Sequence, residues 1–212
     1  MAVLAQTSPL SLLTTVGYRL FGDLRQGLAA LPRGTICEIL GEPSTGRTAV
    51  AQSMLTTVTT GGEVVAVVDC NDAFDPASAQ NSGVDLSKLL LVQCGHRLEH
   101  ALRATDMILH SGGFGLIVLD LCDVLYSALN RIPISYWHRF RRAVEHTPSI
   151  LLVLARQSIA RSCAARQFAL RQQAIQWRGL PPFQTIHCLA MEAVSRKPPG
   201  LGPVRLEAHA EV

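Results

Sequence analysis

The stretch Gly41-Glu42-Pro43-Ser44-Thr45-Gly46-Arg47-Thr48 decides the fold of this chain. It follows the apolar run Thr35–Leu40, which predicts a buried strand, and it leads into Arg47–Thr60, which predicts a helix. Such glycines let backbone N–H groups wrap around a phosphate at the start of the helix, and the Thr48 hydroxyl can hold Mg²⁺. The stretch therefore fits the phosphate-loop pattern G-x-x-x-x-G-K-[ST], except that Arg47 stands in the lysine position.

The arginine in this loop changes the chemistry that the loop can perform. Lysine offers a slim point charge to the terminal phosphates, whereas arginine is a wide, planar fork that keeps its charge. We therefore expect the loop fold to be kept and hydrolysis to be impaired. The alternative is an ordinary glycine-containing turn between a strand and a helix. The predicted nucleotide contacts of the loop are Gly41, Ser44, Thr45, Gly46, Arg47 and Thr48.

Outside the loop, short apolar runs alternate with helical stretches, which is the order of βαβ units. Most runs are continuously apolar, as expected for strands that are covered on both faces. The sequence therefore predicts an α/β fold with a mainly parallel, twisted sheet flanked by helices. The further strands are predicted at 64–69, 89–92, 116–120, 150–155 and 186–194, and the further helices at 97–111 and 135–146.

The chain divides into three predicted segments. Residues 1–30 form a helical arm, residues 31–195 form the core domain, and residues 196–212 form a C-terminal tail. Proline and glycine between 198 and 203 break regular structure before the tail. The tail has two open roles, an added edge strand or a docking segment for a partner.

Asp120 ends the buried run 116–120, as an acidic residue does in a Walker B strand. At the carboxyl end of a parallel strand, its carboxylate would lie on the Mg²⁺ side of a bound nucleotide. We predict that Thr48 and Asp120 contact Mg²⁺ if a nucleotide binds. The alternative is that Asp120 is the N-cap of a helix.

Two stretches resemble the RecA recombinase family. Residues 31–41 resemble its approach to the phosphate loop, and residues 68–76 resemble the segment after its second core strand. The resemblance covers about residues 25–155 and implies a RecA-like P-loop NTPase fold. It also places three functional positions of the family: the catalytic Glu falls at Asn71, the Tyr that stacks on adenine falls at Ser78, and the Asp that meets the adenine amino group is Asp75.

These departures imply a weakened nucleotide site. The Asn71 amide cannot act as a general base, so no residue is predicted with confidence to be catalytic. ATP with Mg²⁺ remains a weak cofactor at most. The chain is therefore predicted not to be a competent ATPase, although an active DNA-dependent ATPase that uses Asp72 as its base is the open alternative. A P-loop enzyme of another class, such as a small kinase, is a further alternative.

Residues 131–142 carry a more specific resemblance, to the ImuA type of RecA-like accessory protein in bacteria. It implies a role in the DNA damage (SOS) response, in error-prone translesion DNA synthesis. The implied partners are RecA, an ImuB-type Y-family-like protein and a C-family polymerase, with single-stranded DNA as a further ligand. It also implies a cytoplasmic location, at the nucleoid when the protein is engaged.

The net charge of +3 hides a division of the chain. Residues 131–178 hold nine arginines and one acid, a charge of +8, whereas the other ten cations and fifteen acids give −5. By the resemblance, the DNA-facing loops fall at about 125–137 and 156–173. The alternative is a solvated surface in an arginine-rich chain. The predicted DNA or partner contacts are Arg131, Trp137, Arg139, Arg141, Arg142, Arg156, Arg161 and Arg166.

The helix predicted at 135–146 is amphipathic, with Ser135 as its N-cap. Trp137, Phe140 and Val144 share one face, which packs on the core in the simplest interpretation and leaves the arginines free. The six cysteines lack metal-site spacing and are predicted to be free and buried. The first residues lack the basic start of a signal peptide, and no apolar run is long enough to span a membrane.

Overall fold

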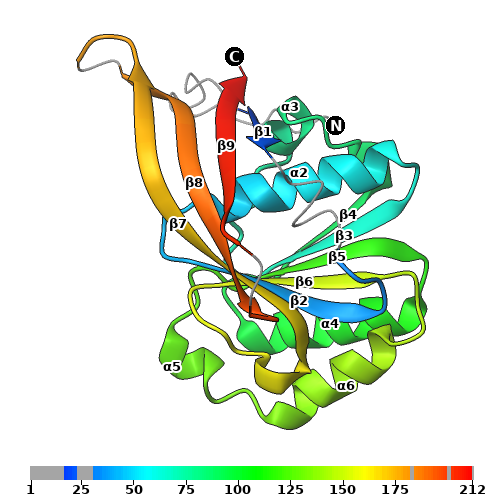
Figure 1. The fold of residues 1–212 in the computed structure, drawn as a ribbon. Coiled ribbons are helices and arrows are strands. Elements are labelled where there is room, and N and C mark those ends of the chain that lie inside the picture. Colours follow the sequence, from blue (N-terminus) through cyan, green and yellow to red (C-terminus); the bar gives the residue numbers. More distant parts are fainter. Residues whose placement is uncertain (1–16, 23–30, 182–183, 200–201, 212) are drawn as a thin grey trace.

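The computed structural model describes residues 17–22, 31–181, 184–199 and 202–211 (Figure 1). Its strands form a nine-stranded sheet in the order β1-β9-β8-β7-β2-β6-β5-β3-β4. The strands are β1 (Gly17–Gly22), β2 (Thr35–Leu40), β3 (Val64–Asp69), β4 (Leu89–Gln93), β5 (Phe114–Asp120), β6 (Ile150–Ala155), β7 (Ala164–Arg178), β8 (Thr185–Lys197) and β9 (Val204–Glu211). The helices are α2 (Arg47–Thr60), α3 (Pro76–Asn81), α4 (Leu98–Ser111), α5 (Tyr126–Leu129) and α6 (Ile134–Val144).

The predicted α/β fold with a mainly parallel sheet is confirmed. Every neighbouring pair from β7 through β2, β6, β5 and β3 to β4 is parallel. Strands β2, β3 and β6 and helix α2 have the bounds that the sequence predicts. Their agreement follows from burial, because continuous apolar runs are needed where helices cover both faces.

An antiparallel extension is the main departure from the predicted sheet. Strand β8 pairs antiparallel with β7, β9 with β8, and β1 with β9. The prediction of a helical arm is wrong for residues 17–22, which form β1, and the rest of 1–30 lies outside the described residues. The structure draws no boundary at residue 196, because β8 runs through Lys197 and β9 continues the same sheet.

Two layers of helices cover the sheet, with α2 and α3 on one face and α4, α5 and α6 on the other (Figure 1). Each side has its own core of buried residues. Trp137 and Phe140 of α6, exposed by 1% and 0%, lie in the core on the α4 and α6 side. Their edge-to-face contact, with ring centroids 5.8 Å apart, confirms that the aromatic face of this helix packs inward.

Both segments predicted as DNA-facing loops are largely regular structure. The first contains α5 and the start of α6, and the second runs into the 15-residue strand β7. Helix α6 begins at Ile134 after Pro133, and Ser135 is not its cap. Pro133 takes the N-cap position with its fixed φ of −59°, so the helix starts before Ser135 and has no side-chain cap.

Two further predictions concern the cysteines and the membrane. All six cysteines are free and buried, as expected. Burial raises the pKa of the Cys37 thiol to about 11, which keeps it protonated. Among the described residues, no helix has the length and apolar character needed to cross a bilayer.

Candidate nucleotide site and basic surface

Residues 41–46 connect β2 to α2 at the carboxyl edge of the parallel strands. The loop is tied to the neighbouring strand by the Gly41 N–H, which donates to the Ala155 carbonyl at 3.2 Å. Both the N–H and the hydroxyl of Thr45 donate to the Glu42 carbonyl, at 3.3 and 2.7 Å. A ligand at this edge meets the end of the sheet where open α/β proteins bind their ligands.

Two residues at the end of the loop adopt the left-handed backbone conformation. Ser44 has φ of 62° and Gly46 has φ of 90°. Gly46 is also the N-cap of α2, and no side chain caps the first turn of this helix. The first N–H groups of α2 therefore lack a side-chain acceptor, which is the arrangement that suits an anion.

Arg47 is the first residue of α2, and its side chain is buried, with 7% exposed. Its Nη1 atom is buried and has no hydrogen-bond partner. The charge of Arg47 interacts with Asp120, but a buried guanidinium nitrogen without a hydrogen-bond acceptor is costly, since it has lost its water without replacement. An anionic ligand would satisfy this group.

Arg47 lines a cavity of about 550 Å³ between the loop, α3 and the antiparallel strands. Asp75 and Ser78, the two adenine positions that the resemblance implied, line the same cavity. Thr48 also lines it, whereas Asp120 is not among the lining residues. The full lining is Ser44, Gly46, Arg47, Thr48, Ala49, Gln52, Ala73, Asp75, Ser78, Ile175, Trp177, Ile186, Leu189 and Ala208.

The carboxylate of Asp75 already accepts hydrogen bonds from the start of α3. Its two oxygens accept from the backbone N–H groups of Ala77 and Ser78, both at 3.1 Å, and from the Ser78 hydroxyl at 2.6 Å. Asp75 is thus the N-cap of α3, and these hydrogen bonds, led by the Ser78 hydroxyl, lower its pKa. Its predicted adenine contact would have to compete with this capping role.

Two carboxylates end neighbouring strands below the loop. Asp69 of β3 pairs in register with Asp120 of β5. Asp69 accepts from the N–H groups of Asn71 and Phe74, at 3.0 and 2.6 Å, and Asp120 accepts from Cys122 N–H at 2.9 Å. Burial raises the pKa of Asp120, with a contribution from the nearby Asp69 charge. Asp120 thus holds the turn after β5, but it is not a helix N-cap, because the next helix, α5, has Leu125 in that position. Its Mg²⁺ contact stays a prediction.

Strand β8 closes over the loop from one side. A Cβ atom at Gly46 would lie 2.4 Å from both the Sδ and the Cε atoms of Met191 and 3.4 Å from Leu189 Cδ2. The absence of a side chain at residue 46 is therefore needed both for its backbone conformation and for this close approach. The wall that β7 and β8 contribute was missed by the sequence analysis, because these strands come more than a hundred residues after the loop.

Glu38 is a second residue that the sequence analysis missed. It is fully buried in β2, and its carboxylate accepts from Ser158 Oγ at 2.9 Å, from Gln167 Nε2 at 2.7 Å, and from two backbone N–H groups at 2.8 Å. Those N–H groups belong to Ile159 and Ala160. The carboxylate thus holds the loop after β6. The sequence signal that could have identified Glu38 was a charged residue inside an apolar run, because a buried charge needs hydrogen-bond partners.

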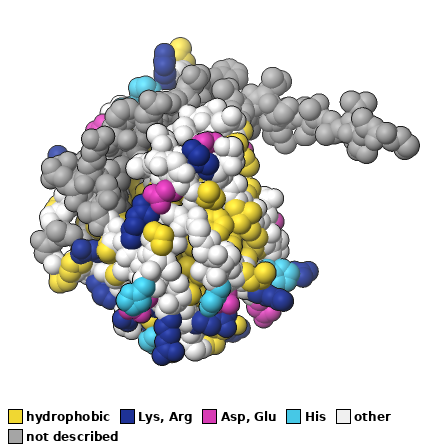
Figure 2. Space-filling view, turned by 90° about the vertical axis from the view of Figure 1, so that its right-hand side faces the viewer, with side chains coloured by type: hydrophobic (Ala, Val, Ile, Leu, Met, Phe, Trp, Pro, Cys, Tyr) yellow, Lys and Arg dark blue, Asp and Glu magenta, His cyan; other side chains and the backbone are white. Residues whose placement is uncertain are grey.

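The predicted basic residues do not form one continuous positively charged surface. Arg139 pairs with Asp106 of α4, with Nε and Oδ1 2.7 Å apart, and lies 5.2 Å from the centre of the Tyr136 ring. Arg161 donates to Asn130 at 3.0 Å, and Arg156 donates to the Cys122 carbonyl at 3.3 Å. In the lower part of the face in Figure 2, Lys and Arg side chains are interleaved with His and acidic side chains.

Trp137 must be removed from the predicted contact residues. Its ring is 1% exposed, so it serves the core and cannot reach a partner in this structure. Arg131, Arg141 and Arg142 are exposed, and Arg166 is half-buried in β7. The exposed arginines of α6 that make no ion pair with a described residue are Arg141 and Arg142.

Two further cavities lie beside arginines. One, of about 530 Å³, joins Gly41 and Glu42 to Arg156, Arg171 and Arg196. These three side chains come from the loop after β6, from β7 and from β8. The cavity therefore places a cluster of cations next to the phosphate loop.

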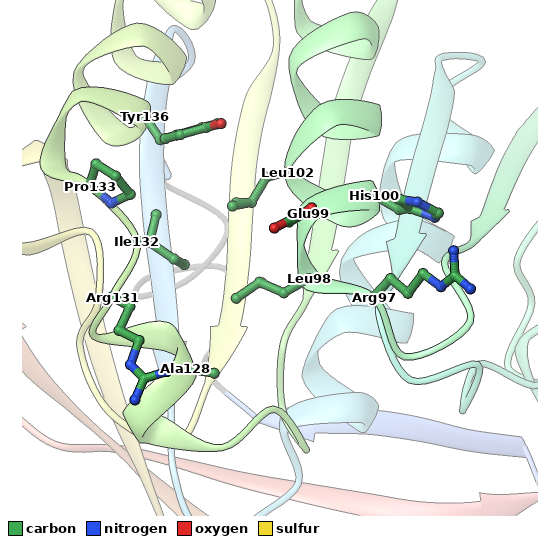
Figure 3. Close-up of a pocket in the computed structure, with 10 residues that line it drawn as sticks. All are labelled: Arg97, Leu98, Glu99, His100, Leu102, Ala128, Arg131, Ile132, Pro133 and Tyr136. Atoms are coloured by element: carbon green, nitrogen blue, oxygen red, sulfur yellow. The ribbon is translucent and has the colours of Figure 1, made fainter.

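The other cavity, of about 630 Å³, lies between α4 and the segment that joins α5 to α6. Figure 3 shows that Leu98 and Leu102 of α4 point across it toward Ile132. Tyr136 and Arg131 also line it. An apolar floor with charged side chains at its margin is typical of a surface that binds another protein.

The sheet with a phosphate loop at its carboxyl edge defines a P-loop NTPase fold of the RecA-like class. The family model of the RecA N-terminal domain matches residues 4–129, more than half of the chain. The chain therefore belongs to the RecA family.

Comparison with curated proteins gives the extent of this relationship. A protein named Protein RecA from Nocardioides sp. is 41% identical over 98 residues, which are 46% of this chain and 28% of that protein. Protein RecA from Thermotoga petrophila is 41% identical over 98 residues, 46% of this chain and 27% of that protein. Protein RecA from Mycobacterium ulcerans is 37% identical over 112 residues, 53% of this chain and 32% of that protein. The chain thus matches about a third or less of the length of these relatives.

Proposed function

We propose that this chain is a RecA-like accessory protein of the DNA damage response. It supports error-prone translesion DNA synthesis through contacts with RecA, with an ImuB-type Y-family-like protein and a C-family polymerase, and through contacts with single-stranded DNA. Its own nucleotide site is degenerate and binds without efficient hydrolysis. The location that goes with this role is the cytoplasm, at the nucleoid when the protein is engaged.

The observation that carries the proposal is the composition of the cavity at the phosphate loop. It holds Arg47, a buried arginine whose Nη1 atom has no hydrogen-bond partner, and so favours an anion. The one carboxylate among its described lining residues is Asp75, whose oxygens already accept hydrogen bonds. A site with a fixed positive charge and no available base can bind a nucleotide but lacks general-base catalysis.

The structure also weighs against Asp72 as a replacement base. Its carboxylate accepts from the Gly95 N–H at 3.1 Å, and its backbone has a left-handed φ of 55°. Asp72 does not line the cavity that Arg47 shares with Asp75. Its side chain is thus occupied in holding the turn after β4.

Support for partner binding comes from the surface on the α4 and α6 side. The apolar floor formed by Leu98, Leu102 and Ile132 lies beside Arg131, and α6 presents Arg141 and Arg142 outward. An acidic segment of a polymerase partner with an apolar anchor matches this combination of charge and shape. The cations at Arg156, Arg171 and Arg196, and the outward Arg141 and Arg142 as well, suit the phosphates of a DNA backbone.

The first test is ATP turnover by the purified chain with and without single-stranded DNA. We expect turnover at the level of the Asp120→Ala variant, because the general base is missing. DNA-stimulated turnover that is lost in Asp120→Ala would contradict the proposal and establish the alternative, an active DNA-dependent ATPase of the RecA family. Circular dichroism of both proteins checks that the variant is folded.

The second test reverses two exposed charges. The Arg141→Glu, Arg142→Glu double variant is expected to lose about tenfold or more of its affinity for single-stranded DNA, because phosphate contacts are lost. Fluorescence anisotropy of a labelled oligonucleotide, at low and moderate salt, measures this. Unlike Arg139, neither side chain is paired with a described acid, so folding should be unaffected.

The matched control is the double variant Arg103→Glu, Arg205→Glu. It changes the net charge by the same amount at exposed arginines of α4 and β9, outside residues 131–178. Equal loss in both double variants would show that only net charge matters. Unchanged affinity in Arg141→Glu, Arg142→Glu would remove α6 from the DNA surface.

A further inference from the structure

Strands β8 and β9 bring a cysteine, a histidine and a glutamate together on the outer antiparallel part of the sheet. Cys188 of β8 and His209 of β9 are direct partners in the strand register. Glu207 lies two residues before His209 and so shares its face. One ligand atom from each of the three side chains lies within 4.8 Å of the others.

Two of the three distances between ligand atoms are close to the edges of a metal-coordination tetrahedron. Cys188 Sγ lies 3.7 Å from His209 Nε2, and Glu207 Oε2 lies 3.2 Å from the same nitrogen. Zinc bond lengths to sulfur, nitrogen and oxygen give tetrahedral edges of about 3.4–3.6 Å between such ligands. A single ion could therefore contact all three atoms after small side-chain movements.

We propose that Cys188, Glu207 and His209 bind one zinc-class divalent ion. Thiolate, imidazole and carboxylate are the ligand types that Zn²⁺ takes, and a water completes four-coordination. When the ion binds, the Cys188 S–H bond breaks, a Zn–S bond forms and the proton passes to solvent. Cys188 is 2% exposed, and such burial shields the metal–sulfur bond from water.

The position of the cluster connects it with the nucleotide cavity without making it part of that cavity. Leu189 and Ala208 are direct register partners that line the cavity. Each is adjacent in sequence to a cluster residue, and neighbours along a strand face opposite sides of the sheet. A metal at the cluster would therefore join β8 to β9 behind the cavity wall.

Cobalt binding to the full chain in the presence of a thiol-free reductant tests the site. Co²⁺ is expected to give one equivalent of a thiolate-to-cobalt absorption band together with the visible bands of a tetrahedral site. Zn²⁺ should displace it and raise the melting temperature. Removal of a direct ligand is expected to weaken binding by at least the roughly 10–100-fold typical of losing an outer partner.

Three variants decide the outcome. Cys188→Ser should lose the thiolate band, and His209→Gln, which changes a half-buried residue, should lose affinity while remaining folded by circular dichroism. Cys163→Ser is the control, because Cys163 contacts His138 at 3.5 Å in a pair that has no third ligand among the described residues. A wild-type chain without a thiolate band, or a folded His209→Gln that binds Co²⁺ as tightly as wild type, overturns the proposal.

Discussion

The Glu38→Ala variant is expected to lose about 3–5 kcal/mol of unfolding free energy, a large part of the stability of a domain. The buried carboxylate accepts four hydrogen bonds, from Ser158, Ile159, Ala160 and Gln167. Its removal leaves the buried N–H groups of Ile159 and Ala160 without an acceptor, whereas Gln167 Nε2 keeps Ser158 Oγ as a partner at 2.9 Å. Urea denaturation followed by circular dichroism measures the change.

Glu42→Ala is the matched control for this variant. Glu42 is an acid four residues further along the chain, its side chain is exposed, and surface substitutions usually change stability by less than about 0.5 kcal/mol. In Glu38→Ala, the loop at 156–163 should also exchange its amide hydrogens faster, because its anchor is gone. Equal stability of the two variants would show that Glu38 is not the anchor of this loop.

The sequence predicts the parallel half of the fold well because burial on both faces leaves a strong signal. Strands β2, β3 and β6 are short apolar runs, and each was predicted with the bounds that the structure shows. Strand β7 carries no such signal, because its second half is mostly exposed and its residues are largely arginine and glutamine. The second half of β7 lacks the alternation of apolar and polar residues that indicates a half-buried strand. Its sequence therefore predicts a polar loop.

The candidate site could be predicted only where it is local in sequence. The loop at 41–46, Arg47 and the N-cap Asp75 lie in contiguous motifs, and the structure places Asp75 and Arg47 at one cavity. The opposite wall, with Ile175 and Trp177, depends on the pairing of β7 with β8 and on their approach to the phosphate loop. No local sequence pattern encodes this arrangement. The pairing of Arg139 with Asp106 likewise joins two helices that are separate in sequence.

Adenosine nucleotides are expected to quench the fluorescence of Trp177. This ring lines the cavity at the phosphate loop and is 55% exposed, whereas Trp137, the other tryptophan of the chain, is 1% exposed. The change can therefore be assigned to one residue. Stacking of a base on an aromatic side chain is worth about 1–3 kcal/mol, so Trp177→Ala should bind about 5–150 times more weakly.

Two further variants separate the parts of this interaction. Trp177→Phe keeps an aromatic face and should bind much more tightly than Trp177→Ala, with the signal read by competition against a fluorescent nucleotide. Arg47→Ala is expected to reduce the preference for ATP over adenosine, because the unpaired Nη1 atom of Arg47 is proposed to bind the phosphates and not the base. If adenosine nucleotides leave the fluorescence of the wild-type chain unchanged and do not displace the probe, the cavity is not a nucleotide site. Such a result would mean that this chain has lost nucleotide binding and not only hydrolysis. The buried Nη1 atom of Arg47 would then remain without an anionic partner.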